Sequence, residues 1–99
     1  MTVYAQEELI KMLKRKRVSF AALFGSRAKG LSGPTSDYDF LVEFDPAAKS
    51  TLYDIVEVKD DLQQILRSPV DVITVGGLNH RLKDEILNSM QVLYDERKR

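Results

Sequence analysis

Residues 25–42 carry the sequence GSRAKGLSGPTSDYDFLV, which joins the end of one apolar run to the start of the next. The stretch opens on a glycine-serine turn, and two aspartates one residue apart, Asp37 and Asp39, introduce the second run. Glycine lets the backbone approach a phosphate closely, serine offers a hydroxyl and an amide, and paired carboxylates bind divalent metal. The stretch therefore predicts a phosphate site beside a metal site, a combination that suggests nucleotidyl transfer.

The apolar runs on either side of this loop predict two strands, over residues 18–24 and 38–44. Each run has the length of a buried strand and is too short for a separate helix. Side chains alternate along a strand, so the second strand should separate its carboxylates from its aromatic rings. One face takes Asp37, Asp39, Leu41 and Glu43, and the other takes Tyr38, Phe40, Val42 and Phe44.

The rest of the chain predicts three helices and two further strands. The helices are expected over residues 4–17, from a cap at Ser50 or Thr51 to about residue 66, and from 79 to about 90. The second helix should bury Leu52, Ile55, Val56, Leu62, Ile65 and Leu66, and the third Leu82, Ile86, Leu87 and Met90. Strands are expected over 70–75 and 92–94, with a frayed tail over 95–99. The whole chain, residues 1–99, is of a size that fits one domain.

The composition excludes several classes of function. The 15 basic side chains equal the 15 acidic ones, so the chain has no overall positive field for a nucleic-acid backbone, which makes nucleic acid a poor partner. The charges are unevenly placed, because residues 35–62 carry eight acidic and two basic side chains. The absence of cysteine excludes disulfides and thiolate metal sites. We see no secretory signal or membrane span and expect a cytoplasmic protein.

Asp71 is the candidate for a third carboxylate in the metal site. Nucleotidyl transfer uses two metal ions about 3.5–4 Å apart, and carboxylates must hold them. Asp71 stands among β-branched residues of the 70–75 strand, where a buried aspartate needs a partner or a metal. The other interpretation is that Asp71 marks the solvent side of an edge strand and that Asp37 and Asp39 are ordinary turn residues. The joint occurrence of the pair, the lone aspartate and the glycine-serine turn favours the functional interpretation.

A phosphate-binding loop of the Walker type is not present. Gly25 and Gly30 have the required spacing, but the pattern then needs lysine where this chain has Leu31. Arg27 is favoured as a phosphate contact, whereas Lys29 is equally compatible with a solvated loop charge.

Residues 25–30 and 36–42, together with the later Asp71, resemble the DNA polymerase β nucleotidyltransferase superfamily, and most closely its minimal nucleotidyltransferase (MNT-domain) branch. The resemblance implies an α/β (α+β) fold with a small mixed β-sheet flanked by helices. It also implies transfer of a nucleoside monophosphate from ATP with two Mg²⁺ ions. By motif position Gly25 and Ser26 would hold the triphosphate, with Arg27 and Ser36 beside them. Asp37 and Asp39 would bind both metals, and Asp71 would bind the catalytic metal and favour deprotonation of the attacking hydroxyl.

Members of the minimal branch commonly pair with a helical HEPN-domain toxin, and some transfer AMP to a tyrosine of that toxin. The resemblance thus implies an adenylyltransferase antitoxin of the type VII kind, in a hetero-oligomer with its toxin. Two alternatives stay open. One is a nucleotide-binding module that inhibits its partner by contact alone, and the other is a small-molecule nucleotidyltransferase.

Overall fold

The computed structural model describes residues 2–24 and 38–97, and their helices and strands follow the predicted order. The helices and strands are α1 (Val3–Arg15), β1 (Val18–Phe24), β2 (Tyr38–Phe44), α2 (Leu52–Leu66), β3 (Val70–Thr74), α3 (His80–Ser89) and β4 (Gln91–Asp95). Two short 3-10 helices, η1 (Pro46–Ala48) and η2 (Val75–Gly77), complete the described elements. None of the described helices is long and apolar enough to cross a membrane.

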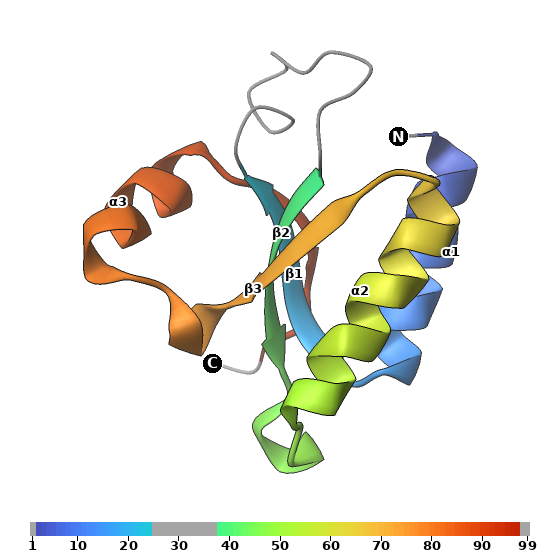
Figure 1. The fold of residues 1–99 in the computed structure, drawn as a ribbon, viewed down its shortest axis with the longest axis horizontal. Coiled ribbons are helices and arrows are strands. Elements are labelled where there is room, and N and C mark those ends of the chain that lie inside the picture. The colour runs from blue at the N-terminus through green and yellow to red at the C-terminus, as the bar shows by residue number, and fades with distance from the viewer. Residues whose placement is uncertain (1, 25–37, 98–99) are drawn as a thin grey trace.

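Within the described ranges the strands form one mixed sheet in the order β3-β2-β1-β4. Strand β1 is antiparallel to both of its neighbours, β2 and β4, whereas β2 and β3 are parallel. Figure 1 shows α1 and α2 side by side on one face of this sheet and α3 on the other. The architecture is the small mixed sheet flanked by helices that the sequence resemblance implied.

Most of the hydrophobic core lies between the sheet and the α1–α2 pair. Helix α1 contributes Leu9, Met12 and Leu13, α2 contributes Val58 and Leu62, and β2 contributes Tyr38, Phe40, Val42 and Phe44. This is the aromatic face that alternation predicted for β2. A second and smaller cluster lies on the α3 side and consists of Phe20, Ala22, Leu41 and Ile86. The carboxylate-bearing face of the sheet is therefore the more thinly packed one.

The ends of α2 and α3 follow from local side-chain chemistry. The backbone amide of Thr51 donates a 2.7 Å hydrogen bond to the carboxylate of Asp54, which closes a capping box at the start of α2. The side chain of Asn79 accepts a 2.9 Å hydrogen bond from the amide of Arg81 at the start of α3. Each bond satisfies an amide that a helix end would otherwise leave unpaired. The sequence had offered Ser50 or Thr51 as the first of these caps, and the structure selects Thr51.

The predicted apolar faces of α2 and α3 are partly wrong. Leu52 and Val56 were expected in the core but are 80% and 56% exposed, and Leu87 on α3 is 43% exposed. The buried position of α2 that the prediction omitted is Val58, which has no exposed surface. The side of α2 that carries Ile55, Val58 and Leu62 packs against the core, so Leu52 and Val56 face away from it. The side chain of Leu82 lies outside the described residues.

Residues 95–97, which were predicted to belong to a frayed tail, make contacts with the rest of the fold. Asp95 is the last residue of β4, and the amide of Glu96 donates a 2.8 Å hydrogen bond to the carbonyl of Ser19. The guanidinium of Arg97 bonds the Asp95 carboxylate at 3.1 Å and lies 4.1 Å from the ring centroid of Phe20. Residues 95–97 therefore belong to the folded unit.

Candidate active site

Two of the predicted site carboxylates, Asp39 and Asp71, lie on neighbouring strands of the described structure. The parallel pairing of β2 with β3 places Asp39 directly opposite Asp71. Neighbouring strands are about 4.8 Å apart, and opposed residues send their side chains to the same face. The two carboxylates, which are 32 positions apart in the sequence, are thus cross-strand neighbours. This arrangement is the one a shared metal site needs.

The strands determine the surroundings of this pair. Asp39 is half-buried, and on its other side it is paired with Phe24, the last residue of β1. Asp71 is exposed, because β3 is an edge of the described sheet. One step further along the same face, Leu41 is paired with Ile73, so an apolar row adjoins the carboxylates. The pair therefore lies at the start of β2 and β3, on the face that α3 partly covers.

The exposure of Asp71 changes one step of the sequence argument. An aspartate in an apolar strand was expected to be buried and to need a partner or a metal, but the structure leaves this side chain in solvent. Exposure on an edge strand is what the non-functional interpretation predicted. The register with Asp39 is what the functional interpretation needs, and solvent access also suits a residue that meets a substrate. The structure brings the two residues together, with Asp39 half-buried and Asp71 on the solvent side.

The remaining predicted site residues lie outside the described residues. They are Gly25, Ser26, Arg27, Lys29, Ser36 and Asp37. In the described part of the chain no three His, Cys, Asp or Glu side chains gather as a metal site would require. Asp39 and Asp71 nevertheless fit Mg²⁺ in donor chemistry, because this ion is held by one or two carboxylates together with the phosphates of a substrate.

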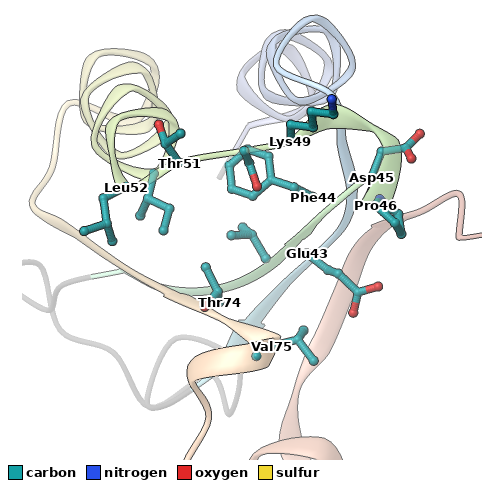
Figure 2. A pocket seen from close by; sticks show the side chains of 13 residues that line it. Glu43, Phe44, Asp45, Pro46, Lys49, Thr51, Leu52, Thr74 and Val75 are labelled. Atoms are coloured by element: carbon teal, nitrogen blue, oxygen red, sulfur yellow. The ribbon is translucent and has the colours of Figure 1, made fainter.

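Sequence reasoning missed a pocket at the opposite end of β2 and β3. Its volume is about 570 Å³, and it is lined by the end of β2, η1, the first turn of α2 and the start of η2. Figure 2 shows Phe44, Leu52, Thr74 and Val75 around this hollow. Val75 is four residues beyond Asp71, a distance of about 13 Å along a strand. The pocket is therefore separate from the carboxylate pair, and no residue spacing in the sequence indicated it.

Comparisons with known proteins identify the family and agree with the fold. The family pattern described as "Polymerase beta, Nucleotidyltransferase" matches residues 7–99. A relative from Methanocaldococcus jannaschii, "Putative protein adenylyltransferase MJ0435", is 39% identical over 83 residues, which cover 84% of this chain and 87% of the relative. A solved structure described as a "putative minimal nucleotidyltransferase" has a TM-score of 0.77 and 30% identity, with 88% of this chain and 87% of that chain covered.

A more distant solved structure shows the same fold. It is that of a tri-AMPylated HEPN toxin in complex with an MNT antitoxin from Shewanella oneidensis, and it matches this chain with a TM-score of 0.71 and 21% identity. The match covers 96% of this chain and 73% of that one.

Proposed function

Because this chain belongs to the polymerase β nucleotidyltransferase family, we propose that it transfers AMP from ATP, with Mg²⁺, to a hydroxyl group of a partner protein. We further propose that the partner is a helical HEPN-domain toxin, that the acceptor hydroxyl belongs to a tyrosine, and that the modification neutralises the toxin. The relative from Methanocaldococcus is named for transfer to protein, and the Shewanella complex contains an AMPylated HEPN toxin. Both names support a protein acceptor.

The observation that carries the proposal is the register of Asp39 with Asp71. A family match alone is compatible with an inactive relative, whereas a pair of opposed carboxylates at a strand start is the part of the machinery that the chemistry needs. Asp37, two positions before Asp39 on the sequence, is the third carboxylate in the proposal. Together these three side chains would hold two Mg²⁺ ions, which supply neutralisation of the negative charge on the attacked phosphate.

The protein's own groups have distinct tasks in this reaction. Gly25 and Ser26 would bind the triphosphate through backbone amides and a hydroxyl, with Arg27 and Ser36 nearby. In the transfer step a bond forms between the acceptor oxygen and the α-phosphorus, and the bond to pyrophosphate breaks. The proton of the acceptor hydroxyl must leave as this happens, and in this proposal Asp71, which is exposed to solvent, would favour its removal. The strand pairing holds Asp71 at a fixed position relative to Asp39 during the step.

A second candidate function is inhibition by binding alone. It is favoured by the exposed apolar side chains of Leu52, Tyr53 and Val56 on α2, which offer a surface for contact with a partner. In that case nucleotide would only order the protein, and loss of the carboxylates would leave inhibition intact.

Intact-mass measurement of the partner tests the proposal. The proposed partner, a helical HEPN-domain protein, is incubated with ATP and Mg²⁺ and with wild type, Asp37→Asn or Asp39→Asn. We expect one or more AMP units on the partner with wild type and none with either variant. A stable complex without any mass gain would refute AMP transfer and favour inhibition by binding alone. A partner that is neutralised equally well by the Asp variants would also refute the catalytic version.

A further inference from the structure

The first two turns of α2 present three large apolar side chains to solvent. Leu52 is 80% exposed, Tyr53 is 75% exposed and Val56 is 56% exposed. Their spacing puts them within one side of the helix, and we refer to them as the α2 apolar face. The fold does not depend on this face, because α2 is attached to the sheet through the fully buried Val58 and Leu62. Exposed apolar residues that cluster in this way mark interaction sites more often than isolated ones do.

The α2 apolar face continues into the 570 Å³ pocket at the end of the sheet. Leu52 belongs to both, and beyond it the pocket wall includes Ile55, Phe44 and Val75. Figure 2 shows Leu52 at one side of this hollow, with Phe44 and Val75 across from it. The two features together form an apolar ridge beside a groove. This shape suits an amphipathic helix, which lays its apolar side chains into a groove of this kind.

The charges around this surface indicate what kind of helix it accepts. Residues 43–61, which contain the face and much of the pocket wall, include six acidic and two basic side chains. Two of the acidic groups, Glu57 and Asp61, are partly neutralised by Lys16 at 2.9 and 4.0 Å. Asp60, one turn beyond Val56, is exposed and makes no ion pair with any residue in the described ranges. A helix with lysine or arginine beside its apolar residues would complement this rim.

A second copy of the chain fits the same surface poorly. The three side chains together expose roughly 400 Å², so a symmetric pair would bury roughly 800 Å² through them, below the range of about 1,200–2,000 Å² for stable interfaces. Such a pair would also bring two acidic rims together, which is unfavourable. A basic partner avoids this repulsion and can add its own contacts in the groove.

We propose that the α2 apolar face and its adjoining pocket form the docking site for the acceptor protein, which presents a helix of apolar residues flanked by basic ones. The inference rests on the proposed function for the identity of the acceptor. The pocket lies three to four residues, about 10–13 Å, beyond the carboxylate pair in the direction of β2 and β3, and the α2 apolar face is on the helix layer that packs against the opposite face of the sheet. Docking at this distance selects the acceptor without contacting the reacting atoms. Loss of docking should therefore raise the KM for the acceptor and leave kcat unchanged at saturation.

Isothermal titration with the proposed partner, a helical HEPN-domain protein, tests the site without any chemistry. The apolar test is the double variant Leu52→Ala/Tyr53→Ala, and its control is Leu87→Ala, which removes an exposed leucine from α3. The charge test is Asp60→Lys, matched by Asp84→Lys on α3. Because all these side chains except that of Leu87 are mostly exposed, folding should be retained, and circular dichroism checks it.

We expect the double variant to raise Kd by about tenfold or more and Leu87→Ala by less than about twofold. Asp60→Lys should raise Kd at low salt, and the difference in Kd between this variant and wild type should become smaller as the salt concentration rises. Asp84→Lys should have the Kd of wild type. In the AMP-transfer assay the double variant should have a raised KM for the acceptor and an unchanged kcat. A double variant that binds as tightly as wild type, or a wild type that does not bind, overturns the inference.

The two proposals fail in different ways. If wild type binds, the double variant does not, and no AMP is transferred, the docking site stands and the transferase falls. If AMP is transferred, and the wild type and the double variant bind the partner equally well, the transferase stands and the docking site falls.

Discussion

Replacing Asp71 by asparagine separates what this side chain does for folding from what it does for the proposed chemistry. Asp71 is exposed on the edge strand β3, and its side chain makes no hydrogen bond or ion pair with the residues that the structure describes. Within the described ranges its backbone is paired with that of Asp39 on β2. Asparagine has nearly the same shape and keeps that pairing, so the substitution removes only the charge.

The expected effects on stability and on rate differ widely. An exposed substitution without lost contacts changes the free energy of unfolding by about 0.5 kcal/mol or less. For a domain of this size that is a shift in Tm of at most about 4 °C. If Asp71 favours loss of the acceptor proton and helps to hold the catalytic metal, AMP transfer should fall by about 100- to 10,000-fold. The variant should therefore be as stable as wild type and nearly inactive.

The assay is a time course of AMP incorporation into the partner, measured by intact mass, beside thermal unfolding of the same samples. Asp84→Asn serves as the control, because it removes an exposed aspartate from α3. If Asp71→Asn transfers AMP at the wild-type rate, Asp71 is only the solvent-side residue of an edge strand. A large loss of stability would refute the reasoning differently, by showing that the charge supports the sheet.

Four other outcomes follow from the same structure. Mg²⁺ and ATP at a hundred times Kd should stabilise wild type by about 2.7 kcal/mol, and Asp39→Asn should lose this gain in a thermal shift. Phe40→Ala empties a fully buried site and should cost about 3–5 kcal/mol in urea unfolding. Asp54→Ala opens the capping box of α2 and should cost about 1 kcal/mol in the same assay. The hydrogen bond to Glu57 raises the pKa of Lys16 above its ordinary value of 10.5. The interaction of charged Lys16 with Glu57 therefore stabilises the fold at neutral pH, and this stabilisation is lost as the pH rises through the raised pKa. Lys16→Met should thus be less stable than wild type at pH 7 and equal to it in strong alkali.

The strands were the most predictable part of this fold. The predicted bounds 18–24 and 38–44 coincide with β1 and β2, because each run is bordered by residues that end a strand, glycine in one case and the Asp45-Pro46 pair in the other. Alternation also predicted which side chains of β2 face the core. The pairing of Asp39 with Asp71 required more, since it depends on the register of two strands separated by a helix. The sequence supplied the residues, and only the structure supplied the register.

The outward-facing turn of α2 could not have been predicted from periodicity. Leu52 and Val56 satisfy the helical spacing of a buried stripe as well as Val58 and Leu62 do. Which stripe is buried depends on how α2 is rotated about its axis when it packs on the sheet, and that is a tertiary property. The same ambiguity explains the error at Leu87. In α2 the mispredicted residues are the ones from which we derive the docking surface, as expected where function conflicts with burial.

The two faces of the sheet differ in how much hydrophobic core they contribute. Among the described residues, the α1–α2 face has thirteen buried core residues, whereas the cluster on the α3 face has four. The rows of β2 and β3 on the α3 face begin with Asp39 and Asp71, positions at which a purely structural sheet would place apolar side chains. The thin α3 core is the structural consequence of keeping carboxylates there. Substitutions that destabilise the fold should therefore concentrate on the α1–α2 side, and those that change chemistry without unfolding the protein should concentrate on the α3 side.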